Sequence, residues 1–392
     1  MASQPVASRL AQFFDGDTGS MRDIGLVDAQ QLCGMVRWNP RARAEVRRVG
    51  GLQPLTSALG AAARKGGAGG DDASGELVAA LANALAFCAL DVRNKELMVD
   101  NKVERGGCDI YEVARLTLIQ MQRQGSGGAG MGAGGSKYAP APSFAGADPL
   151  PLAALCRLIW NASTIDNEFT QRVAAGGGDT SVCISGGGGR GGGASLVTLL
   201  VAECTWTEAR MASTSASAQV AENDSSADAV RDCRLQLWGA LWALCGSAST
   251  SSLHSESWLP LFKHAISILD KSGKRRSDMA SSASMARQTA VLNQMAGASG
   301  AVGLYNDNRN VGLRLQPPFV LATQRHLVTA IVGLLGHAFD DTCVRDHVRD
   351  LNGSDDVLSR LLTAADPEVD DKIIALTRMA LGKLVDTQTL PL

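Results

Sequence analysis

A recurring phrase constrains this 392-residue chain more than any other feature. In each copy an apolar helix is followed by a short polar break, a charged helix, glycines and a leucine-rich segment. Four copies can be recognised, over residues 32–59, 81–107, 155–178 and 327–362. Self-similarity of this kind predicts a solenoid, in which stacked helical units share a continuous core. The usual product of a solenoid is binding surface rather than chemistry.

Composition favours an all-α fold. Hydrophobic residues make up 45% of the chain, which is ample for a core, but aromatic residues make up only 4%. In residues 327–336 the apolar side chains recur at the spacing of one helix face, at Leu327, Ala330, Ile331, Leu334 and Leu335. Such a face must pack on a neighbouring helix.

Four low-complexity segments interrupt the helical phrases. We expect residues 1–392 to form a single irregular solenoid with flexible inserts rich in Gly, Ser and Ala, at 124–149, 176–194, 212–228 and 271–314. Segments of this composition bury too little apolar surface to offset their ordering entropy. The polar breaks lie near Asn39, Asp91, Asp166, Ser249 and Asp340, at intervals of 52, 75, 83 and 91 residues. When the inserts are left out, these intervals approach one or two helical units of about 40 to 47 residues each. We therefore expect about five to seven units.

The order of parts resembles the armadillo repeat family. The matching segments are ARAEVRRVGGLQPL, NKELMVDN with ERGG, NEFTQRVAAGGG with SLVTLL, and VRDHVRDLNG with VLSRLL. The resemblance implies a right-handed α-solenoid, armadillo- or HEAT-like, whose third helices line a concave groove for protein partners. The stretch GLLGHAFDDTCVRDHVRDLNGSDDVL is also similar to the C-terminal domain of the ataxin-ten family.

The groove signature of importin-alpha is incomplete here. That armadillo protein grips a basic peptide with a Trp and an Asn four residues later, on successive third helices. The Asn-like positions of this chain hold Gly34, Cys88, Asn161, Gly246 and His337, and the earlier positions hold Gln30, Ala84, Arg157, Trp242 and Gly333. The two residues never occur together, so we do not expect a nuclear-import receptor.

Motifs for catalysis and cofactor binding are weak. Gly130, Gly132 and Gly135 match GxGxxG, but they follow a helix inside a glycine-rich run, whereas dinucleotide binding needs a strand, a turn and a helix. Lys137 follows Ser136 rather than a glycine, which excludes a Walker A loop. The five histidines lack metal-binding spacing, and no GxSxG elbow occurs. We therefore expect no enzymatic activity, no cofactor and no metal.

The charge and the cysteines of the chain bear on its compartment and its partners. The net charge of −2 gives no global attraction to nucleic acids or membranes, and nine cysteines without a CxxC pair fit reduced thiols in a cytoplasmic protein. Residues 37–50 hold five Arg and one Glu, whereas residues 340–371 hold nine Asp and one Glu against three Arg. These charges fit either solvated helix faces or two docking surfaces of opposite sign, for example for a tubulin tail and a basic segment.

The function predicted is a non-catalytic scaffold for other proteins, or a structural subunit of a larger assembly. By association with other armadillo scaffolds, a cilium, flagellum or axoneme is one candidate location. Two alternatives stay open, an exchange factor or chaperone for a small GTPase, and an enzyme framed on a solenoid. The candidate partner-binding residues are Arg37, Arg41, Arg157, Asn161, Trp242, Trp258 and His337. Trp242, four residues after Trp238, fits a core position as well.

Overall fold

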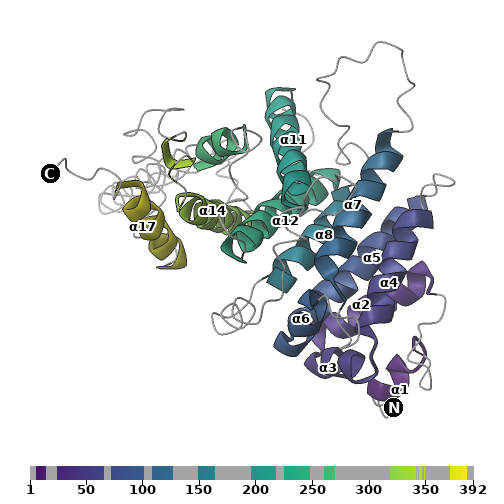
Figure 1. Ribbon diagram of the computed structural model, residues 1–392. Coiled ribbons are helices and arrows are strands. Elements are labelled where there is room, and N and C mark those ends of the chain that lie inside the picture. Colours follow the sequence, from purple (N-terminus) through teal and green to yellow (C-terminus); the bar gives the residue numbers. More distant parts are fainter. Residues whose placement is uncertain are drawn as a thin grey trace, which may run out of the picture.

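The computed structural model describes a series of helical segments of the chain. The described residues are 6–14, 24–65, 72–100, 108–126, 149–163, 196–217, 225–247, 260–269, 318–340, 342, 344–346, 348 and 371–385. The named helices are α1 (Val6–Leu10), α2 (Leu26–Trp38), α3 (Pro40–Arg48), α4 (Leu52–Lys65), α5 (Asp72–Cys88), α6 (Val92–Val99), α7 (Ile110–Ser126), α8 (Pro149–Ser163), α11 (Leu196–Ser217), α12 (Ser225–Ser247), α14 (Pro318–Ala338) and α17 (Asp371–Val385). Figure 1 shows how they follow one another.

A unit of one short helix and two longer helices repeats along the chain. The first complete unit consists of α3, with 9 residues, α4, with 14, and α5, with 17. The next consists of α6, with 8 residues, α7, with 17, and α8, with 15. α11 and α12 are the second and third helices of the following unit, and residues 260–269 and α14 occupy these places in the next. α2 and α17 are the third helices of the units at the two ends.

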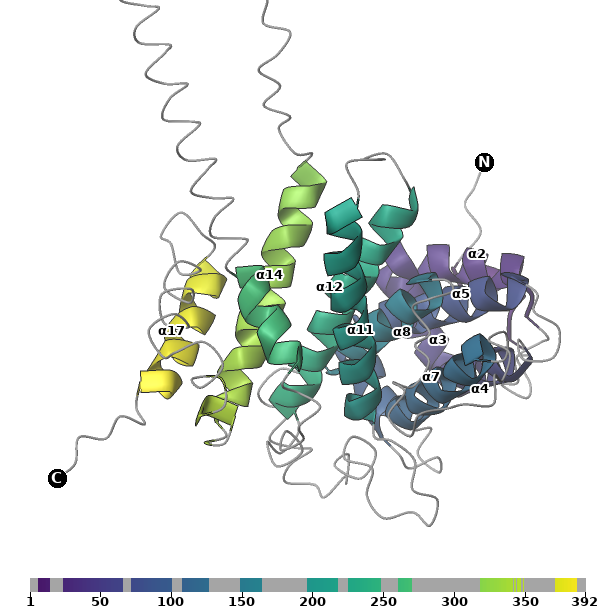
Figure 2. The ribbon, with the colours of Figure 1, turned by 90° about the horizontal axis from the view of Figure 1, so that it is seen from above.

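Third helices form one row and second helices form another. α2, α5, α8, α12, α14 and α17 pack side by side in chain order, each on the next. α4, α7 and α11 pack in the same way in a second layer, and Figure 2 shows α4 and α7 below α2 and α5. This arrangement of three-helix units confirms the predicted all-α, armadillo-like solenoid.

Neighbouring third helices run parallel. Arg157 of α8 contacts Asn83 of α5, and Asn161, one turn later in α8, contacts Ala86, also further along α5. The contacts therefore advance in the same direction along both helices. As a consequence, the C-terminal ends of the third helices share one edge of the molecule.

Glycines let the third helices of the C-terminal half approach closely. The indole of Trp160 in α8 lies against Gly239 of α12, and that of Trp242 in α12 lies against Gly333 of α14. The methyl group of Met379 in α17 lies against Gly336 of α14 in the same way. A Cβ atom at any of the three glycines would overlap the side chain that covers it. Each glycine thus provides the socket for a large side chain of a neighbouring helix.

Side-chain caps fix the junctions between a third helix and the next first helix. Asn39 alone separates α2 from α3, and its Oδ1 accepts from the backbone N–H groups of Arg41, at 3.0 Å, and Ala42, at 3.4 Å. Asp91 does the same before α6, where its Oδ1 accepts from the N–H groups of Arg93 and Asn94. Asn and Asp are favoured helix N-caps because they satisfy these otherwise unpaired donors.

The predicted inserts overlap the described helices at their ends. α11 extends to Ser217 and α12 begins at Ser225, so both flanks of the predicted insert 212–228 are helical. α7 likewise extends to Ser126 and α8 begins at Pro149, inside the predicted insert 124–149. Composition alone does not define where such helices end, because Ser and Ala remain compatible with a helix that packed residues already nucleate. Inserts 176–194 and 271–314 lie outside the described residues.

Candidate functional site

The row of third helices carries a strip of polar residues that bridges three of them. Arg157 of α8 donates from one guanidinium nitrogen to Asn83 Oδ1 of α5, at 2.5 Å, and from the other to Asp232 Oδ2 of α12, at 2.7 Å. Gln236 of α12 donates to the second oxygen of Asp232, at 3.1 Å. The planar guanidinium suits this task because its donors are fixed relative to one another. Arg157 therefore joins α5, α8 and α12 into one continuous surface.

Asn161 also lies on α8, one helical turn after Arg157. Its amide nitrogen donates to the backbone oxygen of Ala86 in α5, at 2.9 Å. Both residues are only partly exposed. The strip is therefore held in one arrangement by bonds between helices, while its outer side meets solvent.

An arginine and two aromatic residues, on α2 and α5, form a further cluster on the row of third helices. The guanidinium carbon of Arg37 lies 4.6 Å from the centre of the Trp38 ring and 5.5 Å from that of the Phe87 ring in α5. A cation over an aromatic face is attracted by the ring quadrupole. Trp38 is 76% exposed, which is unusual for so large an apolar side chain.

Arg41 is placed differently from the other candidates. It lies on α3, the short first helix of its unit, rather than on a third helix, and its side chain is exposed. Arg37 and Arg41 are still close in the chain, on either side of the Asn39 cap. They lie at the edge where the third helices end.

Other arginines of the basic N-terminal cluster have internal partners. Arg43 donates to the backbone oxygens of Val36, at 2.8 Å, and Arg37, at 2.6 Å, and so caps the C-terminal end of α2. Arg47 pairs with Asp91 at 2.6 Å, and Arg48 pairs with Glu45. Arg43 and Arg47 thus join α3 to other parts of the solenoid, whereas Arg48 pairs within α3.

Trp242 and His337 lie towards the C-terminal end of the row. Trp242 is partly buried against Gly333, so the alternative core placement describes it better than an open groove position. His337 lies in the last turn of α14, and burial lowers the pKa of its imidazole, with the charge of Lys383 adding to the effect. Lys383 of α17 donates to the backbone oxygen of Gly336 and pairs with Asp340. Trp258 lies outside the described residues.

The sequence analysis missed Asn83, Asp232 and Gln236 of the strip, and Phe87 beside it. The third-helix positions assigned to α5 were Ala84 and Cys88, but both are fully buried, and the partly exposed residues are Asn83 and Phe87. The assignment was displaced by one residue. A polar Asn among the alanines and leucines of α5 was the available signal.

Buried polar groups of the described residues serve packing. Glu208 of α11 accepts from two guanidinium nitrogens of Arg234, at 2.6 and 2.7 Å, and from the indole nitrogen of Trp238, at 2.8 Å. Burial raises the pKa of the Cys88 and Cys245 thiols to about 12 and that of Cys108 to about 11, which disfavours the nucleophilic thiolate. No cluster of three His, Cys, Asp or Glu side chains suited to a metal ion occurs among the described residues.

Of the helices in the described segments, none is both long and apolar enough to cross a bilayer.

No protein-family model matches the chain, and no curated protein matches it either. Among solved structures, the designed armadillo repeat protein YIII(Dq)4CqI aligns with a TM-score of 0.45 and 10% sequence identity, over 97% of this chain and 100% of that chain.

Proposed function

We propose that this protein is a non-catalytic scaffold that binds an extended segment of a partner protein along the face formed by its third helices. One observation carries the proposal, the fixed polar strip in which Arg157 ties α5, α8 and α12 together. A surface that is already ordered before binding loses less conformational entropy when a partner docks. Partly exposed amide and guanidinium groups at helical spacing can also bond to an extended peptide backbone.

Gly34 offers a direct test of this face. It is an exposed residue of α2, and a Cβ atom added to it meets nothing within 4 Å. Gly34→Gln therefore places a new side chain on the exposed side of the first third helix, α2, without a steric clash. Gly60→Gln is the matched control, because Gly60 lies on the second helix α4 and its Cβ atom makes only an ordinary contact with Arg64, at 3.6 Å. Each change should stabilise its helix by about 0.5–1 kcal/mol.

The experiment is a native pull-down of the tagged chain with quantitative mass spectrometry, at low and at moderate salt. We expect a stoichiometric partner with the wild-type chain and with Gly60→Gln, and a reduced amount with Gly34→Gln. A chain recovered as a monomer without a partner at both salt concentrations contradicts the scaffold. Equal recovery with both variants contradicts the assignment of the binding face.

The same measurement tests the more detailed predictions of the sequence. Partners that belong to one large complex support a structural subunit, and axonemal proteins among them support a ciliary location. Recovery of a small GTPase in only one nucleotide state would favour a regulator of that GTPase over a scaffold.

A further inference from the structure

Three of the exposed large apolar side chains lie where a third helix passes into a first helix. Trp38 ends α2 and is 76% exposed, while Leu90 and Val92 flank the Asp91 cap before α6 and are 47% and 50% exposed. Three exposed arginines lie at the same two junctions, Arg37, Arg41 and Arg93. We call these six residues the basic ridge.

Equivalent positions of two successive units build the ridge. Arg41 follows the Asn39 cap by two residues, and Arg93 follows the Asp91 cap by two residues. Trp38 and Leu90 each precede their cap directly. The ridge thus repeats one pattern, an apolar residue before the cap and an arginine in the first turn after it.

Bonds between the units hold the two junctions together. Asn94 of α6 is fully buried and donates to the backbone oxygens of Arg43, at 3.1 Å, and Cys88, at 3.0 Å. Arg47 of α3 donates to Asp91 and to Asn94 Oδ1. Arg37 of the first junction lies over Phe87, which precedes the second. The ridge is therefore presented on a rigid frame.

The charges of the ridge are available to a partner. Arg37, Arg41 and Arg93 form no ion pair with a described residue, in contrast to Arg47 and Arg48. The ring of Trp38 holds the Arg37 guanidinium against an exposed apolar surface. Exposed Trp with adjacent Arg is the composition of interface hot spots.

We propose that the basic ridge binds an acidic segment of a partner protein that carries leucine or aromatic side chains between its carboxylates. The carboxylates pair with Arg37, Arg41 and Arg93, and the apolar side chains cover Trp38, Leu90 and Val92. Arg suits this role because its fork of donors matches a carboxylate. The proposal rests on the scaffold function and names the chemistry of a partner.

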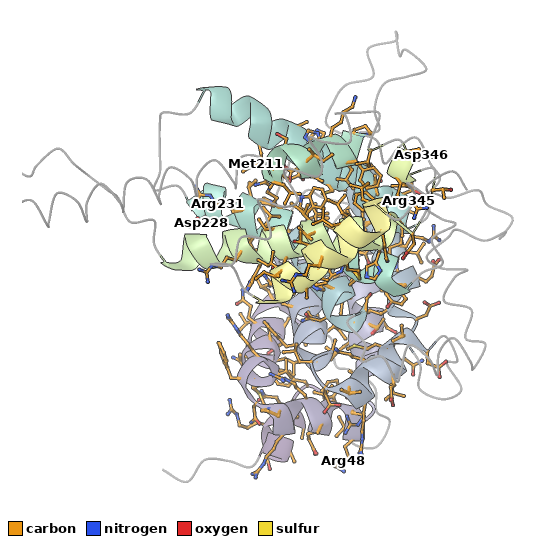
Figure 3. All side chains as sticks on the ribbon, turned by 90° about the vertical axis from the view of Figure 1, so that its left-hand side faces the viewer. Arg48, Met211, Asp228, Arg231, Arg345 and Asp346 are labelled. Atoms are coloured by element: carbon orange, nitrogen blue, oxygen red, sulfur yellow. The ribbon has the colours of Figure 1, made fainter. Side chains whose placement is uncertain are left out.

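The junction that begins the last unit, after α14, differs in charge from the two junctions of the basic ridge. Arg345 donates to the backbone oxygen of Phe339, six residues earlier, as Arg43 does to that of Arg37. The same kind of junction therefore follows α14, but it presents Asp340 and Asp346 as exposed residues. Figure 3 shows Arg345 and Asp346 far from Arg48, at the other end of the molecule. We expect an acidic segment to prefer the first junctions, with their exposed arginines, to the last one, which exposes carboxylates.

Fluorescence anisotropy tests the proposal with the full chain. The probe is a fluorescein-labelled glutamate-rich peptide with leucines one helical turn apart, and its twin has Gln in place of every Glu. We expect the acidic peptide to bind more weakly as salt rises, because exposed ion pairs are screened. The double variant Arg41→Glu, Arg93→Glu should weaken binding by about tenfold or more, and Trp38→Ala should weaken it at constant charge.

Arg325→Glu is the matched charge control for Arg41→Glu alone, because Arg325 is an exposed residue of α14 outside the ridge. Circular dichroism of each variant checks that it folds. Equal binding of the acidic and the Gln peptide, or equal losses in Arg41→Glu and in Arg325→Glu, overturns the proposal. Salt-sensitive self-association of the chain that Arg41→Glu abolishes, without peptide binding, would assign the ridge to a second copy and overturn it as well.

The two proposals fail separately. Loss of peptide binding with a partner still captured in the pull-down leaves the scaffold intact and removes the ridge. Peptide binding by the wild-type chain, with no partner captured in the pull-down, leaves the ridge and removes the third-helix face.

Discussion

The indole ring of Trp242 in α12 covers the Cα atom of Gly333 in α14 so closely that no Cβ atom fits between them. The contact joins third helices of successive units, whose axes can approach because the glycine has no side chain. Trp160 and Gly239 form the same contact between α8 and α12. These pairs set the spacing of the row in its C-terminal half.

Gly333→Ala should destabilise the fold. An added methyl group overlaps the Trp242 ring, and overpacking of this kind costs about 1–3 kcal/mol, which exceeds the gain in helix propensity of about 1 kcal/mol. The measurement is the midpoint of urea unfolding. Gly34→Ala is the control, because its methyl group enters open space and should raise the midpoint. A second control, Gly333→Ala combined with Trp242→Ala, should lose less stability than the two single changes added together. Additive losses would contradict the contact.

Arg157→Lys should behave like a deletion rather than a conservative change. A lysine ammonium has no planar fork and cannot reach Asn83 and Asp232 with the same geometry. The Arg157–Asp232 pair is partly exposed, at 25% and 39% of the side chains, so we expect a coupling of only about 0.2–1 kcal/mol that falls with salt. A double-mutant cycle with Asp232→Asn measures it. A coupling unchanged by salt would contradict the contribution of the two charges.

Asn94→Leu should be among the most destabilising single changes in the N-terminal half. Its buried amide satisfies the backbone oxygens of Arg43 and Cys88 and accepts from Arg47. Loss of these bonds leaves buried polar groups unpaired, at about 1–3 kcal/mol for each group. Thermal unfolding followed by circular dichroism gives the effect, and Asn161→Leu, at a partly exposed bond, should cost less. The reverse order would contradict the role assigned to Asn94.

Alkaline pH should weaken the fold through its buried thiols. Desolvation by burial raises the pKa of Cys88 and Cys245 to about 12 and that of Cys108 to about 11, above an ordinary value of 9.0. The unfolded chain therefore releases these protons first, so their contribution is complete below pH 9.0 and is lost progressively above it. Unfolding free energy measured from pH 8 upwards should fall, and Cys245→Ala should reduce the slope. An unchanged slope would mean that other groups dominate.

Local sequence patterns were sufficient to predict much of the fold. The 3.6-residue periodicity predicted the helices, and the phrase that ends in Gly-Gly identified the Asn39 and Asp91 junctions 52 residues apart. Arg157 and Asn161 also lie on the third-helix row, as the repeat alignment placed them. Whether they bind a partner stays a prediction.

Contacts between residues far apart in the chain could not be predicted from the sequence. Arg43 and Arg47 counted as surface charge because their partners, the end of α2 and Asp91, are defined only once the helices pack. Trp242 and Gly333 form their contact across 91 positions of the chain, and neither residue alone predicts it. Trp38 is one of six tryptophans, and the sequence alone does not show which of them the fold leaves exposed.

The position of the third-helix ends has a practical consequence for engineering. One residue, Asn39, joins α2 to α3, whereas α8 begins at Pro149, at the opposite end of the third helices, 23 positions after the last residue of α7, Ser126. Because the third helices are parallel, a fluorescent protein or a purification domain placed between α7 and α8 would emerge away from the edge that holds Trp38 and Arg41. The chain thus offers one edge for labelling and leaves the other free for recognition.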